Sequence, residues 1–227
     1  MNERIEKAAA GLRRRVLKEV MRQHPDPTNA RLYLHPRYAA TVLGYDFQVR
    51  GDLDAELRSV DAAAARKRGV ITGLLDRDER VIAVSERYSP EEQRFTGAHE
   101  LGHLVLHPDL PTMHRDRNDR PTRDPLERDA NQFAAAYLMP AKWIRDDILD
   151  KFGECPLRVN DTLAWWLDRE DPERFLHADR KRDVDLALAV ASCTSLGNGH
   201  FCSMHNEYGV TAQAMAWRLI DLEVIGP

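Results

Sequence analysis

Residues 89–107 read SPEEQRFTGAHELGHLVLH, and this stretch decides the architecture that we expect. Ser89, followed by Pro90 and by Glu92 three positions after the serine, is the pattern of a capping box that opens a helix. A proline at position 108 limits the helix at its other end, so we expect it to run to about Leu106. The sequence therefore predicts one helix that carries the whole motif His99-Glu100-Leu101-Gly102-His103.

The motif has the spacing of a metal site. His99 and His103 lie one helical turn apart on one face, so their imidazoles can hold the same ion. Glu100 lies beside that face, where it can reach a metal-bound water but is poorly placed to be a third ligand. This pattern is typical of zinc peptidases, in which the ion lowers the pKa of water to about 7 and the glutamate accepts its proton.

A catalytic zinc ion needs a third protein ligand and an open fourth position. The extended metzincin motif is excluded, because Leu106 and Asp109 stand where that motif needs Gly and His. A carboxylate from a second helix remains, and Glu127, at the start of a helix opened by the capping signature Asp124-Pro125, fits best. The other two acidic candidates are Asp124 and Asp129.

The surrounding pattern predicts an α+β fold that is mostly helical. Two short β-like runs, 70–75 and 81–85, are joined by a polar turn and indicate an antiparallel hairpin. We expect this small antiparallel sheet to pack on the helix that carries the motif, and 108–123 to form a solvated loop. The helices expected in this part of the chain cover residues 1–22, 35–43, 52–68, 125–139 and 141–152, and a strand covers 47–49.

We expect two parts: a zinc peptidase domain over 1–154 and a helical region over 155–227. Helical patterns recur at 163–167, 184–192 and 211–222, and the last of these has a helix-turn-helix character. A second zinc site is an alternative for four Cys and His residues near the end of the chain, but their spacing fits no standard finger, so loop or core roles are favoured. These four residues are Cys193, His200, Cys202 and His205.

The composition is that of an ordinary globular protein, with 227 residues, 43% hydrophobic and 31% charged. A net charge of -4 argues against DNA binding by overall basicity, although it permits a local basic patch. Three cysteines are unsuited to a disulfide framework. The N-terminal residues show no secretory signal, and no stretch is apolar enough to span a membrane. We therefore expect a cytoplasmic protein with no membrane association.

Residues 94–107, RFTGAHELGHLVLH, closely resemble the metallopeptidase domain of ImmA/IrrE-type proteins. In that family the motif follows Arg-Phe-Thr and a small residue and ends in Leu-His. The family's second signature is similar to residues 127–140, with Glu127, Ala130, Asn131, Phe133, Ala134 and then Leu138-Met139-Pro140. The resemblance covers about 35–152. It implies a gluzincin-like peptidase with one catalytic zinc ion, held by His99, His103 and Glu127, and with Glu100 as the catalytic base.

The resemblance also implies a substrate. Such proteins typically cleave a partner transcriptional repressor of the helix-turn-helix type, and radiation-response systems, mobile elements and phage-defence operons use them. We therefore expect an endopeptidase that derepresses stress, DNA-damage or phage-defence genes. Single-stranded DNA is a candidate activator, because Arg13–Arg15 and Arg66–Arg68 are basic clusters. The alternative is a repressor- or DNA-binding regulator whose zinc site is structural or sensory, although an intact Glu100 speaks against it.

Several supporting residues complete the expectation. Asn131 lies one turn after Glu127, where it could hydrogen-bond the outer nitrogen of a ligand histidine. His107 matches the Leu-His ending of the family, which favours a structural or supporting role over metal ligation. The choice of an oxyanion-stabilising group among Tyr137, Tyr208 and a C-terminal histidine stays open, as does occupation of the fourth zinc position by a Cys or His in a latent form.

Overall fold

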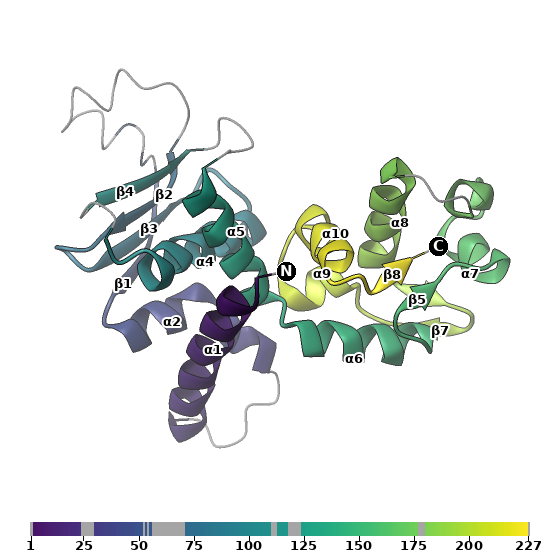
Figure 1. Cartoon of the computed structure of the whole chain (residues 1–227), viewed down its shortest axis with the longest axis horizontal. Helices are drawn as coiled ribbons and strands as arrows, with labels where there is room; N and C mark the ends of the chain where they lie inside the picture. Colours follow the sequence, from purple (N-terminus) through teal and green to yellow (C-terminus); the bar gives the residue numbers. More distant parts are fainter. Residues whose placement is uncertain are drawn as a thin grey trace. The chain divides into compact units, whose positions relative to one another are not determined.

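The computed structural model describes residues 2–23, 30–51, 53, 55, 71–109, 113–117, 124–176 and 180–226. The chain divides after Leu138 into two compact units, and Figure 1 shows the elements of each. The α+β class with a mostly helical content is confirmed. The domain boundary expected after residue 154 stays a prediction.

The first unit contains four α-helices and one 3-10 helix among its described residues. They are α1 (Glu3–Gln23), η1 (Ala30–Leu34), α2 (Pro36–Leu43), α4 (Pro90–Leu106) and α5 (Pro125–Leu138). The predicted helices over 1–22 and 35–43 are confirmed, and α2 ends where Gly44 adopts a left-handed conformation with φ +80°. The helix predicted over 52–68 lies almost wholly outside the described residues.

A four-stranded sheet completes this unit, in the order β1-β3-β2-β4. Its strands are β1 (Asp46–Arg50), β2 (Ile71–Asp76), β3 (Val81–Ser85) and β4 (Met113–Arg117). The predicted hairpin is confirmed, because β2 and β3 pair antiparallel with Leu75 opposite Ile82. However, β1 runs parallel to β3, with Phe47 opposite Ile82. The sheet is therefore mixed rather than wholly antiparallel, since a parallel pair is made by a long crossover that a local pattern does not reveal.

The expectation of a loop over 108–123 is wrong for residues 113–117, which form the edge strand β4. β4 pairs antiparallel with β2, and the register shifts between Ile71 and Gly73, which is the mark of a bulge. An edge strand is held by main-chain hydrogen bonds on one side only and needs no alternation of apolar side chains. Because its sequence is mostly charged and does not alternate with apolar residues, this strand could not be predicted from the sequence pattern.

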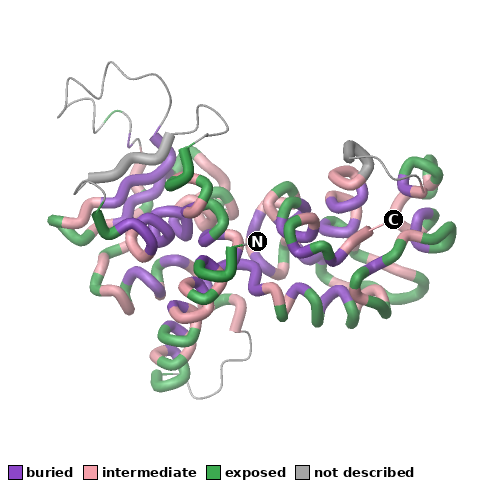
Figure 2. The backbone as a smooth tube through the Cα atoms, viewed as in Figure 1, coloured by how far each residue is buried: buried purple, intermediate pink, exposed green. Residues whose placement is uncertain are grey.

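Helix α4 is the centre of the first unit. It contacts α2, α5, β2 and β3, and the stretch that carries the motif, 97–103, is buried (Figure 2). The capping box is present, with Ser89 Oγ accepting from Glu92 N and Glu92 Oε2 accepting from Ser89 N. Close packing requires two of its glycines: a Cβ on Gly97 would lie 2.6 Å from Phe47 Cε2, and one on Gly102 would lie 3.0 Å from Ala130 Cα.

The second unit is built from helices and short strand pairs. Its described elements are α6 (Ala141–Phe152), β5 (Leu157–Arg158), α7 (Asp161–Leu167), η3 (Pro172–Phe175), α8 (Arg180–Ser192), β6 (Ser195–Leu196), β7 (Gly199–His200), α9 (Met204–Tyr208), α10 (Ala212–Asp221) and β8 (Ile225–Gly226). Helix α10 packs on α8 and α9, and β5 pairs in parallel with β8. The predicted helices over 141–152, 163–167, 184–192 and 211–222 are confirmed.

The last two helices follow each other closely. Helix α9 ends at Gly209, whose φ is +58°, and α10 begins after Thr211, whose side chain accepts from Ala214 N. Arg218 on α10 is buried and donates to the main-chain oxygen of Met139. No described helix meets the length and hydropathy needed to cross a bilayer.

Candidate metal centre

Three predicted site residues come together where α4 meets α5. His99 Nε2 lies 2.9 Å from His103 Nε2. Glu127 Oε2 lies 3.1 Å from the first of these nitrogens and 3.5 Å from the second. The two histidines come from one turn of α4 and the glutamate from the first turn of α5. In the described part of the chain this is the only group of three or more His, Cys, Asp or Glu side chains with that convergence.

The geometry of this triad fits a metal ion. The three separations, from 2.9 to 3.5 Å, are compatible with side chains that would hold one zinc ion together. His99 and His103 are buried, whereas the side chain of Glu127 is 19% exposed. The two histidines are therefore shielded from solvent, whereas solvent reaches the triad at Glu127 on α5.

Local sequence explains why the two helices approach so closely. Gly102 stands between the two histidines, and its missing side chain lets Ala130 of α5 pack directly on α4. Asp124 Oδ1 accepts a hydrogen bond of 2.9 Å from Leu126 N, which fixes the start of α5 two residues before Glu127. Asp124 therefore serves as a cap, and it lies outside the group of converging ligand atoms.

Glu100 lies in the core beside the triad. Glu100 is fully buried, with 0% of its surface exposed. Its carboxylate faces β2, where a Cβ on Gly73 would lie only 2.6 Å from Glu100 Oε1. The absence of a side chain at position 73 thus gives the carboxylate its place. If the triad held a metal ion, this buried carboxylate would be placed to accept a proton from water there.

Both histidines of the triad have a contact at the outer ring nitrogen, Nδ1. His99 Nδ1 lies 2.9 Å from Asn131 Oδ1, which confirms the contact predicted for this asparagine. His103 Nδ1 lies 3.1 Å from His107 Nδ1. His107 thus lies beside His103 and outside the group of converging atoms, which agrees with the supporting role favoured from the sequence. Such outer contacts fix ring orientation and tautomer in metal sites.

Part of the chain is similar to known proteins. Residues 55–153 match the family model described as IrrE N-terminal-like domain. This part of the chain is therefore similar to the peptidase domain of ImmA/IrrE-type proteins. Over 84 residues the chain is 39% identical to the radiation response metalloprotease IrrE of Deinococcus deserti, a match that covers 36% of this chain and 30% of that protein. It is 37% identical to the radiation response metalloprotease IrrE of Deinococcus radiodurans, over 36% of this chain and 25% of that protein.

The matched segment thus spans less than a third of either relative. Both relatives are named metalloproteases. Among the residues that the structure describes, the group formed by His99, His103 and Glu127 could hold a metal ion.

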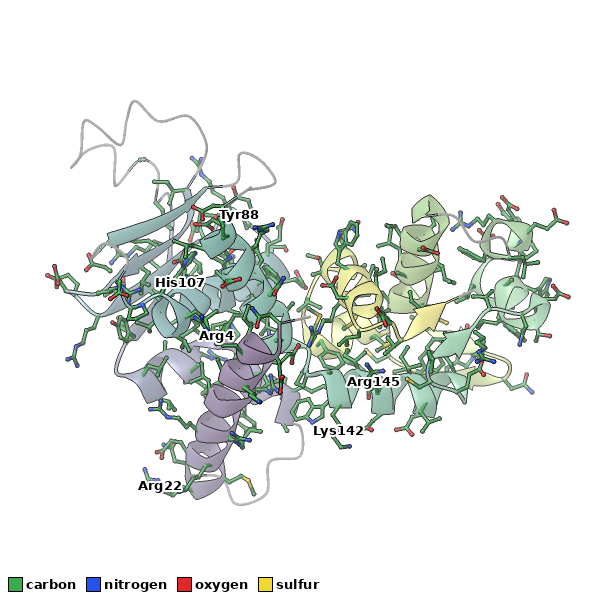
Figure 3. The ribbon with its side chains drawn as sticks, viewed as in Figure 1. Arg4, Arg22, Tyr88, His107, Lys142 and Arg145 are labelled. Atoms are coloured by element: carbon green, nitrogen blue, oxygen red, sulfur yellow. The ribbon has the colours of Figure 1, made fainter. Side chains whose placement is uncertain are left out.

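Two arginines of the first unit hold the C-terminal end of α4, where His107 is the capping residue. Arg77 Nη2 donates to the main-chain oxygens of His103 at 3.0 Å and His107 at 2.8 Å. Arg4 Nη2 lies 3.4 Å from the oxygen of Leu106, and Figure 3 labels Arg4 and His107 in this part of the molecule. These cations satisfy carbonyls that the last turn of a helix leaves open.

Sequence reasoning missed the place of Asp129. It treated this residue as an alternative ligand, but Asp129 Oδ2 lies 3.9 Å from His107 Nε2 and outside the converging group. The spacing of two residues from Glu127 gave no signal for this contact. The contact depends on how α5 is rotated against the end of α4.

The two tyrosines considered as oxyanion stabilisers are both fully buried. Tyr137 stacks on Phe133, and burial raises its pKa above the ordinary value while the nearby Arg94 opposes that shift. Tyr208 donates a hydrogen bond of 2.5 Å to Asp147 Oδ2 within the second unit. Both side chains are therefore core residues of their own units.

The alternative of a second zinc site gains no support. Cys193 Sγ donates to the main-chain oxygen of Ser195 at 3.2 Å, and burial raises the pKa of this thiol. His200 and Cys202 are exposed. Among the residues that the structure describes, this stretch contains no converging ligand group.

Proposed function

We propose that this protein is a zinc-dependent endopeptidase whose ion is held by His99, His103 and Glu127. The observation that carries the proposal is the convergence of three ligand atoms beside the buried carboxylate of Glu100. Two imidazoles and one carboxylate with an open fourth position are the ligand set of catalytic zinc. A purely structural site has four protein ligands and no need of a neighbouring base.

The roles of the chain's own residues follow from their positions. Bound zinc would supply a Lewis acid and lower the pKa of water to about 7. Glu100 would accept the proton from that water and deliver it to the amine that leaves the cleaved bond. Asn131 and His107 contact the outer nitrogens of His99 and His103 and would orient these two rings for metal binding.

The proposed substrate is a helix-turn-helix transcriptional repressor, whose cleavage would derepress stress, DNA-damage or phage-defence genes. The resemblance to ImmA/IrrE-type proteins supports this choice, and so do the names of the two Deinococcus relatives, which are radiation response metalloproteases. We place the reaction in the cytoplasm, which agrees with three cysteines that carry no disulfide.

Single-stranded DNA remains our candidate activator, and α1 is the described element that would contact it. Arg14 and Arg15 are exposed on this helix, whereas Arg13 donates to the main-chain oxygen of Ala136. Arg66–Arg68 lie outside the described residues. If the protein binds DNA phosphates, its affinity for DNA should fall steeply as the salt concentration rises from low to moderate. An affinity that does not change with salt concentration would refute DNA as the activator. Such binding without cleavage would favour the alternative, a regulator whose zinc site is structural or sensory.

The test of the proposed activity is a cleavage reaction with the repressor encoded beside the gene for this protein. The purified protein should cut the repressor at a defined bond, and a chelator should abolish cleavage. Glu100→Gln keeps the size of the side chain but removes the base, so it should lower the rate by about 10²–10⁴-fold. Glu91→Gln, the same change in the first turn of α4, is the matched control and should cut normally. Equal rates for both variants would refute the assignment of Glu100.

A further inference from the structure

The two ligand histidines are supported in different ways. His99 meets an amide oxygen of α5, at 2.9 Å from Asn131. His103 instead meets a second imidazole, at 3.1 Å from His107. The contact between His103 and His107 joins two nitrogens, and a hydrogen bond between them requires that one carry a proton while the other offers a lone pair.

Metal ligation decides which nitrogen carries the proton. A histidine that binds through Nε2 in its neutral form has its proton on Nδ1. His103 therefore has to donate from Nδ1, and His107 Nδ1 has to accept. The proton of a neutral His107 is then placed on Nε2. That nitrogen faces Asp129 Oδ2 at 3.9 Å, where a negative charge favours the protonated nitrogen.

The position of His107 is itself fixed by its surroundings. The residue is 8% exposed, and Arg77 holds the main-chain oxygens of both His103 and His107. The two imidazoles consequently belong to one clamped turn, with ring centroids 5.3 Å apart. A ring held in this way can orient its neighbour.

We propose that His107 is a positioning residue of the metal site: its Nδ1 accepts the proton of His103 Nδ1, and Asp129 keeps the proton of His107 on Nε2. The inference rests on the proposed zinc site of His99, His103 and Glu127. It extends the site by a chain of contacts from His103 to His107 and from His107 to the partly exposed carboxylate of Asp129. Asn131 gives His99 an acceptor of a different kind.

The first experiment measures zinc affinity by competition with a chelator. His107→Phe keeps a ring of similar size but removes the acceptor, so the dissociation constant should rise about 10–100-fold, the usual effect of losing such a contact. His107→Asn returns an oxygen near the position of Nδ1 and should bring the constant back to within about threefold of the wild type. His35→Phe changes a partly buried histidine outside the ligand group and should leave zinc affinity unchanged.

The outcomes separate this inference from the proposed function. An unchanged affinity in a folded His107→Phe variant, or an equal loss in the Phe and Asn variants, would overturn the inference alone. A wild type that binds no metal would overturn both.

A second measurement needs no variant. Long-range ¹H–¹⁵N spectra of the zinc-loaded wild type should show His103 protonated on Nδ1 and His107 on Nε2. A proton on His107 Nδ1 would overturn the assignment, whatever happens to the folding of the variants.

Discussion

Gly73→Ala is the substitution whose effect follows most directly from the structure. Gly73 lies on β2, which contacts the helix that carries the metal site. A Cβ at this position would lie 2.6 Å from Glu100 Oε1 and 2.6 Å from Thr96 Cγ2. Both atoms belong to α4, so a single added methyl group presses on the proposed base and on the helix that carries it.

The size of the displacement can be worked out. Ordinary contacts begin near 3.4 Å, so the carboxylate and the new methyl group have to separate by about 0.8 Å. Glu100 is fully buried, and β2 is paired on both sides with β3 and β4. Strand β2 and the atoms packed around Glu100 can therefore shift only slightly, so the carboxylate itself has to move. A misplacement of about 1 Å at a reacting group costs about 10²-fold in rate.

The assay compares the turnover number for repressor cleavage with the bound metal of the same sample. Gly73→Ala should lose about 10²-fold in turnover and keep its metal, because His99, His103 and Glu127 are not pressed by the new atom. Gly11→Ala is the matched control: no atom lies within 4 Å of the new Cβ, so activity should be unchanged and α1 slightly more stable. A folded, metal-loaded Gly73→Ala protein with turnover within about threefold of the wild type would refute the reasoning.

Two further predictions concern the same unit. Gly102→Ala should weaken metal binding by at least about tenfold in chelator competition, because the new methyl group pushes α5 and its ligand Glu127 away from α4; a variant with wild-type affinity would show that the close helix contact is not needed. His35 is partly buried and lies near Arg94 and Arg37, and the loss of hydration together with these two charges lowers its pKa from 6.5 to about 4. As pH falls from 6.5 to 4, the unfolded chain binds a proton here before the folded one does, so stability is lost. His35→Asn keeps an acceptor for the helix cap and should lose less free energy of unfolding than the wild type over that range in urea titrations of chelator-treated protein; equal losses would contradict the shift.

The sequence was sufficient where the decisive contacts are local. The start of α4 follows from Ser89 and Glu92, and the end of α2 follows from Gly44, because caps and left-handed turns act within a few residues. The two histidines of the site follow from helical periodicity alone. Glu127 required an additional argument about ligand chemistry, since its distance along the chain carries no geometric information.

The rest depends on how elements meet. The parallel direction of β1 and the edge strand β4 are set by main-chain pairing with partners distant in the sequence. The contact between Asp129 and His107 depends on the rotation of α5 about its axis. The approach of Glu100 to Gly73 depends on the distance between α4 and β2. None of these quantities is encoded in a periodic pattern, and they determine the finer structure of the site.

The most direct test of the account is the metal content of the purified protein and of two variants. Elemental analysis should find about one zinc ion per chain in the wild type and in Glu100→Gln, because the base is not a ligand. Glu127→Ala removes one of three ligands and should retain far less than one equivalent after dialysis. A wild type that neither contains nor takes up zinc, or a Glu127→Ala protein that holds a full equivalent, would contradict the proposed centre.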